Sequence, residues 1–214
     1  MRMLLLSVMF ALLSACGGKE DSPELKNIKA LYKHLNCEEA IPAIEAFLEE
    51  RPEHVDSLVM LGNCQRKSKN PTAAKAAYEK ALAAEPVNTS AVLGLSVIMR
   101  TEAHQLKLNG KTEEATKQFK LAAARLKRSL SVEELDPQVH TTLSLVLLDL
   151  GDKEKGLEHA QRAWKLDNKN AAVAANLAIA YDANNMPTER DEALENAEKN
   201  GYKKVDQLRS KFSQ

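Results

Sequence analysis

Apolar residues along much of this chain recur at the spacing of one face of an α-helix. In the best-defined stretch Ala115, Phe119, Ala122 and Leu126 follow one another at i, i+4, i+7 and i+11. Polar turns that contain Gly, Pro or Asn separate such stretches, and a composition rich in Ala, Leu, Lys and Glu favours helix over strand. The pattern therefore predicts an all-α protein.

One helical unit is defined at almost every position, in residues 55–88. Small residues alternate there with larger ones at helical spacing, which lets two helices pack closely, and a proline ends the second helix. The small positions are Gly62, Ala74 and Ala81, the larger ones are Leu58, Leu61 and Tyr78, and the proline is Pro86. This order resembles the tetratricopeptide repeat, a helix–turn–helix unit of about 34 residues.

The resemblance continues along the chain, with Leu143, Ser144 and Gly151 in one further unit and Leu177, Ala178 and Tyr181 in another. It implies a right-handed α-solenoid of about five stacked repeats. The expected repeats are residues 25–54, 55–88, 89–136, 137–170 and 171–202, followed by a capping helix within a domain that spans 25–214.

The third repeat is longer than its neighbours. Its turn signal, Asn109-Gly110, comes later than the pattern requires, and the spare residues divide into about two extra turns for each helix. Elongated helices are expected at 90–108 and 112–130, with tips that project as an antiparallel hairpin. Residues 105–118 at these tips form one candidate binding surface; a hairpin that packs only on itself is the alternative.

The N-terminal segment reads as an export signal. Arg2 precedes an apolar run from Met3 to Leu13, which is too short to span a bilayer. The order Leu13-Ser14-Ala15-Cys16 resembles the lipobox of bacterial lipoproteins. It implies that residues 1–15 are removed and that Cys16 carries the lipid; an ordinary signal peptide with a chance cysteine is the alternative.

Residues 16–24 are expected to form a flexible tether between the lipid and the fold. Gly17 and Gly18 follow the cysteine, and no Asp stands there to retain a lipoprotein in the inner membrane. The resemblance therefore favours the outer membrane, with the protein facing the periplasm.

The other two cysteines, Cys37 and Cys64, lie on neighbouring antiparallel helices of the first two expected repeats. Their register brings the Cα atoms within about 7 Å, the reach of a disulfide. An oxidising cell envelope favours that bond. Two buried thiols are the alternative.

Composition excludes several function classes. Lys plus Arg and Asp plus Glu each total 30, and aromatic residues make up 4% of the chain, so nothing favours nucleic-acid binding. The five histidines form no zinc spacing. No nucleophile motif or phosphate-binding glycine loop appears. We expect no cofactor, no metal and no enzymatic activity.

The resemblance also implies where a partner binds, because the first helix of each repeat lines the concave face of such an array. The residues expected there are Val59, Asn63, Leu93, Val97, Thr141, Leu145, Asn176 and Ile179. This mostly apolar groove favours an apolar helix or extended segment. The basic residues that bind a C-terminal carboxylate in some family members are absent, and packing against neighbouring repeats is the alternative role.

These observations predict a lipid-anchored periplasmic scaffold that binds an envelope protein or peptide segment and no nucleic acid. An assembly factor, a pilotin-like protein or an adaptor all fit that architecture. The alternative is a structural envelope lipoprotein that self-associates and has no peptide ligand.

Overall fold

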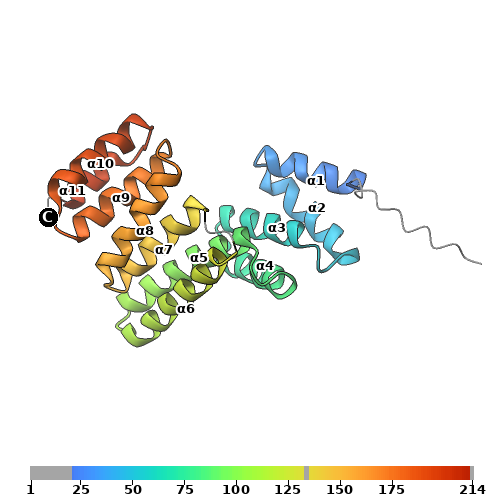
Figure 1. The fold of residues 1–214 in the computed structure, drawn as a ribbon. Coiled ribbons are helices and arrows are strands. Elements are labelled where there is room, and N and C mark those ends of the chain that lie inside the picture. Colours follow the sequence, from blue (N-terminus) through green and yellow to red (C-terminus); the bar gives the residue numbers. More distant parts are fainter. Residues whose placement is uncertain (1–20, 133–134, 213–214) are drawn as a thin grey trace, which may run out of the picture.

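The computed structural model describes residues 21–132 and 135–212, which form eleven helices and no strand. Successive helices are antiparallel hairpins stacked into an elongated α-solenoid, as predicted (Figure 1). The signal segment and Cys16 lie outside the described residues. The helices are α1 (Pro23–Lys33), α2 (Cys37–Glu50), α3 (Val55–Lys67), α4 (Pro71–Ala84), α5 (Thr89–Leu108), α6 (Thr112–Leu130), α7 (Pro137–Asp149), α8 (Lys153–Leu166), α9 (Ala171–Ala183), α10 (Pro187–Lys199) and α11 (Val205–Phe212).

The expected tether is wrong in its last two residues. Helix α1 begins at Pro23, because the Ser22 hydroxyl accepts a hydrogen bond from the Leu25 N–H at 3.3 Å and Pro23 suits the first helical turn. Asp21 also forms an ion pair with Lys29 at 2.6 Å. The folded part of the chain therefore begins before residue 25.

Side-chain caps explain why most other helices begin where they do. The side chain before each of these helices accepts a hydrogen bond from a backbone N–H of the first turn, which would otherwise have no partner. The capping residues are Asn36, His54, Asn70, Asn88, Asp136 and Asn170.

The turn inside each hairpin contains one residue with positive φ. Glycine takes this position in two hairpins, at Gly110 and Gly151, whereas Leu35, Lys69 and Asn185 take it in the others. Glycine adopts this conformation without steric cost, but a side chain is strained there. The shared geometry shows that all the hairpins use the same turn.

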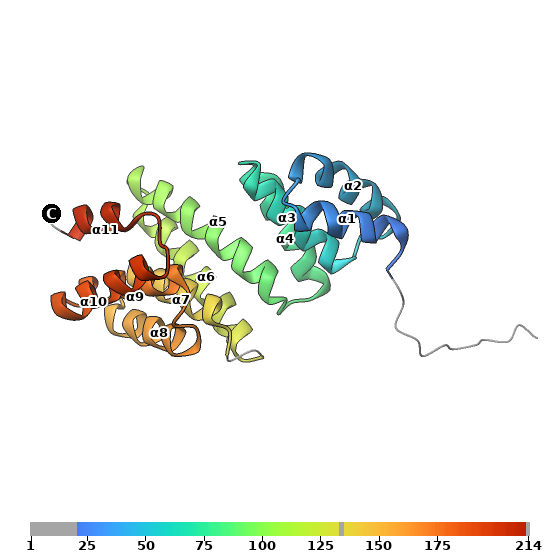
Figure 2. The ribbon, with the colours of Figure 1, turned by 90° about the horizontal axis from the view of Figure 1, so that it is seen from above.

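The third repeat has the elongated helices that the sequence predicts. Helix α5 has 20 residues and α6 has 19, while α3 and α7 have 13 each. Figure 2 shows α5 and α6 in the middle of the molecule, with α1–α4 toward one end and α7–α11 toward the other. A single hydrophobic core runs from α3 to α7 through both long helices.

Candidate functional site

The concave face is less open than the sequence predicts. Val59 is 9% exposed and Asn176 is 3% exposed, so both are buried and the expectation that they face a groove is wrong. Val59 packs into the core that α3 shares with α5. Neither amide atom of Asn176 has a hydrogen-bond partner among the described residues.

The expected ligand-binding amide of Asn63 is used inside the fold. Its Oδ1 accepts a hydrogen bond from the Tyr78 hydroxyl at 2.7 Å, and its Nδ2 donates to the Tyr32 hydroxyl at 2.9 Å. Both tyrosines come from neighbouring helices, so the three side chains link α1, α3 and α4. Asn63 therefore serves repeat packing, which was the alternative role considered from the sequence.

Leu93, Thr141, Leu145 and Ile179 are only partly exposed. Leu93 packs against the central core, and the Thr141 hydroxyl donates to the Pro137 carbonyl at 2.8 Å. Val97, at 42%, is more exposed than any of these. Of the expected groove residues, it offers the most apolar surface to a partner.

An ionic cluster joins repeats three and four. The Asp149 carboxylate at the end of α7 accepts hydrogen bonds from the Arg100 guanidinium and, at 3.1 Å, from Nε2 of His104. The His104 ring also meets Phe119 edge-on, with ring centroids 5.3 Å apart. These contacts fix the long hairpin against α7.

An open, mostly apolar site lies on another flank of α5. Helix α3 ends at Lys67 and α4 begins at Pro71, whereas α5 continues to Leu108, so its last two turns extend beyond α3. A cavity of about 730 Å³ lies at this step. We call it the step cavity; it is lined by Arg66, Lys69, Pro71, Val97, Ile98, Thr101, Glu102, Gln105, Leu106 and Asn109.

Sequence reasoning identified Val97 and part of the hairpin surface, but it did not connect them with Lys69 and Pro71. The signal was present, because the third repeat has long helices and the second does not. A step between helices of unequal length follows from that difference once they are stacked side by side.

The step cavity carries net positive charge at one end. Glu102 is paired with Lys75 at 2.8 Å, so its charge is compensated. Burial raises the pKa of Tyr78, and a hydrogen bond with Arg66 opposes that rise. In the described part of the chain no carboxylate pairs with Lys69.

Comparison with known proteins agrees with this architecture. A tetratricopeptide repeat family model matches residues 25–89. A thermophilic tetratricopeptide repeat protein of Thermus thermophilus, TTC0263, superposes with a TM-score of 0.72 at 21% identity, over 89% of this chain and 95% of that chain. The chain folds as a tetratricopeptide repeat array.

Further structures have the same fold. A MamA double mutant, RS-1 ArsTM, superposes with a TM-score of 0.61 at 17% identity, over 84% of this chain and 95% of that chain. Another MamA structure gives 0.57 at 16% identity, over 86% and 92%. A search of curated proteins by sequence found no match.

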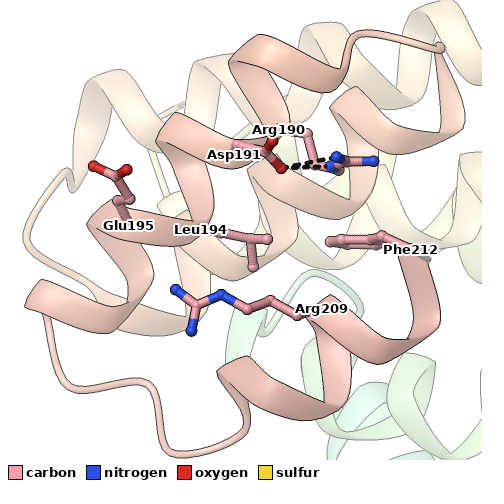
Figure 3. Close-up of a pocket in the computed structure, with 6 residues that line it drawn as sticks. All are labelled: Arg190, Asp191, Leu194, Glu195, Arg209 and Phe212. Atoms are coloured by element: carbon pink, nitrogen blue, oxygen red, sulfur yellow. Dashed lines mark hydrogen bonds and ion pairs between the residues drawn. The ribbon is translucent and has the colours of Figure 1, made fainter.

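The C-terminal end of the array has a cavity of about 390 Å³ between α10 and α11 (Figure 3). Its arginines are already paired: Arg190 with Asp191 at 2.8 Å and with Asp182 at 3.2 Å, and Arg209 with Glu198 at 2.6 Å. The Arg190 guanidinium also lies 5.4 Å from the centroid of the Phe212 ring. These contacts hold the capping helix in place, and they compensate the charge of both arginines that line this cavity.

Two histidines meet inside the fourth repeat of the array. Nδ1 of His140 and Nδ1 of His159 lie 2.9 Å apart, beside a cavity of about 450 Å³. Burial lowers the pKa of His159, and the charge of His140 lowers it further. In residues 21–132 and 135–212 no group of three or more His, Cys, Asp or Glu side chains is placed to hold a metal ion.

A disulfide joins the first two repeats of the array. Cys37 at the start of α2 is bonded to Cys64 in α3, and their Cα atoms are 5.1 Å apart, within the reach that the sequence register indicates. Separately, none of the helices in the described ranges is both long enough and apolar enough to cross a bilayer.

Proposed function

We propose that the chain is a protein–protein interaction scaffold of the bacterial cell envelope. It is anchored by a lipid on Cys16, faces the periplasm from the outer membrane and holds an envelope protein. An assembly factor, a pilotin-like protein and an adaptor are the specific forms of this function that fit the architecture.

The step cavity is the observation that carries the proposal. An apolar site of about 730 Å³ on a stacked-helix scaffold is large enough to receive several side chains of a partner. Val97 is exposed there on a helix whose other side is buried in the central core. Exposed apolar surface in such a setting is typical of an interaction site.

Two features support a place in the envelope. The apolar run that ends at Cys16 has the order of a lipoprotein signal. The disulfide between Cys37 and Cys64 fits an oxidising compartment, because thiols are kept reduced in the cytosol. Replacing Cys16 with Ser should move the protein from the membrane fraction to the soluble periplasmic fraction.

Site-specific photocrosslinking in living cells tests the binding function. A photoreactive amino acid at Val97 should capture one envelope protein, and the same residue at Leu121 should not. Leu121 is a matched control, because it is 47% exposed on α6 and does not line the step cavity. Crosslinks between copies of this chain alone would instead indicate the self-associating lipoprotein.

A further inference from the structure

The charges of the chain cancel in total, but they are segregated between helices. Helix α2 contains five glutamates and no Lys or Arg, whereas α6 contains five Lys and Arg residues and no acidic residue after its first turn. Both are second helices of their repeats, so their exposed sides lie on the convex face of the array. The balance of 30 basic against 30 acidic residues therefore hides one acidic and one basic surface.

The basic surface surrounds an exposed leucine. The side chains on the outer side of α6 recur at helical spacing, and we call them the α6 ridge: Lys117, Lys120, Leu121, Ala124 and Arg128. The leucine in the middle of this ridge is 47% exposed. In the described part of the chain no carboxylate pairs with the Lys or Arg side chains of the ridge. The ridge thus presents an apolar side chain within uncompensated positive charge.

The acidic surface borders an apolar groove. A cavity of about 410 Å³ lies between α2 and α4 above α3, and we call it the α2–α4 groove. Most of its lining is apolar: Leu48, Pro52, Leu58, Leu61, Ala73, Ala76 and Ala77. Glu45 and Glu49 line it from α2 and Lys80 from α4, so its net charge is negative. Neither glutamate has a basic partner within residues 21–132 and 135–212.

The two surfaces match in spacing as well as in sign. Glu38 and Glu49 lie 11 residues apart on one exposed side of α2, and Lys117 and Arg128 lie 11 residues apart on the α6 ridge. Eleven helical residues span about 17 Å. If α6 of another copy lies antiparallel to α2, both ends of the ridge therefore meet a charge of opposite sign. Leu121, one turn from Lys117, is then level with the α2–α4 groove.

A second copy of this chain is the occupant that these observations favour. Within one copy α4 lies between α2 and α6, so the ridge does not reach the groove of its own chain. An anionic lipid surface would attract the ridge, but it would repel the unpaired glutamates of α2 on the same convex face. Helix α10 is a weaker acidic partner, because basic residues of the fold already pair with Asp191, Glu195 and Glu198.

We propose that copies of this chain associate through their convex faces, with the α6 ridge of one copy in the α2–α4 groove of another. Leu121 enters the groove, and Lys117 pairs with Glu49 beside it. Arg128 pairs with Glu38 at the other end of α2. This association goes beyond the proposed scaffold function, and it leaves the step cavity free for an envelope protein. Self-association and partner binding then use different faces of the array.

Photocrosslinking of the full chain in living cells tests this contact. A photoreactive amino acid replaces Ala124, an exposed ridge position that leaves Leu121 intact. This chain is co-expressed with a second copy that carries a different tag. We expect a product with both tags, whose crosslink mass spectrometry maps to α2 or α4. The same probe at Glu192, which is exposed on α10, is the control and should give no such product.

Charge exchange provides the decisive comparison. Glu38→Lys together with Glu49→Lys in the copy without the probe should lower the two-tag product about 10-fold, because like charges then face each other. Adding Lys117→Glu and Arg128→Glu to the chain with the probe should restore it. All four side chains are exposed, so circular dichroism should show unchanged helicity. Glu192→Lys in the copy without the probe should leave the product unchanged.

The proposal is overturned if the probe at Ala124 gives no product with both tags. It is also overturned if the α2 charge change leaves that product undiminished, or if the exchanged α6 ridge does not restore it. Capture of phospholipid alone would assign the ridge to a membrane surface, and capture of another envelope protein alone would assign it to that protein.

The scaffold function is tested separately, because Val97 lies on neither the ridge nor the groove. Its crosslink to an envelope protein should persist in every charge-exchanged chain. Loss of that crosslink in the unchanged protein would remove the scaffold function and leave the contact between ridge and groove standing.

Discussion

The Tyr78 hydroxyl donates a hydrogen bond to Oδ1 of Asn63 at 2.7 Å, across the interface between α4 and α3. Asn63 in turn donates to Tyr32, so one amide joins the first two repeats. An asparagine that the sequence assigned to a ligand is thus a structural link. The Asn63 amide is therefore engaged in the stacking of the repeats and is not offered to a ligand on the concave face.

Tyr78→Phe should lower the free energy of unfolding by about 1–2 kcal/mol, because the half-buried Asn63 amide loses its donor. Urea unfolding monitored by circular dichroism measures the change. Tyr181→Phe is the matched control: its hydroxyl accepts a long 3.5 Å bond from Gln161 at an exposed site, so its effect should stay below about 0.5 kcal/mol. Equal losses of unfolding free energy in Tyr78→Phe and Tyr181→Phe would show that the bond to Asn63 stabilises the fold no more than the exposed bond does.

Gly94→Ala should destabilise the array by about 1–3 kcal/mol through overpacking. A Cβ at this position would lie 2.3 Å from Cζ of Tyr78, a ring that is fully buried and cannot move aside. The double variant with Tyr78→Leu, which removes that ring atom, should be less destabilised than the sum of the single changes. Additive effects in thermal unfolding would contradict this contact.

Leu35→Gly should raise the free energy of unfolding by about 0.5–1 kcal/mol, because a side chain is strained at a φ of 56° and glycine is not. Leu35 is 59% exposed, so little packing is lost. The reverse change at the equivalent turn, Gly151→Ala, should cost about 1 kcal/mol. Apart from Gly151 itself and its two chain neighbours, nothing lies within 4 Å of the added Cβ, so the cost is conformational. Chemical denaturation of both variants should show opposite signs.

Removing the disulfide should weaken the N-terminal end of the array selectively. The cysteines are 27 residues apart, and a loop of that size contributes about 3–4 kcal/mol in the entropic model. Hydrogen exchange of the Cys37→Ala, Cys64→Ala double variant should be faster in α1 and α2 and unchanged in α7–α10. Uniformly faster exchange would show that the whole array unfolds as one unit.

Stability should fall in mild acid because of His159. Its pKa is lowered from 6.5 by burial and by His140, so the unfolded chain binds more protons than the native one as the pH falls through 6.5. Protonation of the accepting Nδ1 atom also breaks the Nδ1–Nδ1 hydrogen bond, worth about 1 kcal/mol.

Melting temperatures between about pH 7.5 and pH 5 measure this effect. His159→Gln should flatten this fall in melting temperature, whereas His34→Gln, at an exposed site, should not. A slope that His159→Gln leaves unchanged would assign the acid sensitivity to other groups.

The sequence predicted only some of the residues that are exposed to a partner, and Asn63 and Val97 illustrate the physical reason. Both take the ninth position in their repeats, yet Asn63 is half-buried and bonded to two tyrosines, whereas Val97 is 42% exposed. Periodicity tells which face of a helix a residue lies on, but not what the neighbouring helix places over it. Tyr32 of α1 and Tyr78 of α4 both reach Asn63, and these contacts between helices do not follow from the period of a single helix.

The sequence alone determined the all-α class, the register of the repeats and the long third hairpin, because helical spacing, caps and prolines act over a few residues. Only the tertiary structure decided that Asn63 joins two tyrosines, that Asn176 is buried, and that Lys69 and Leu106 line one cavity. Those features depend on side chains that come from different repeats, and these side chains come close to one another only when the helices stack.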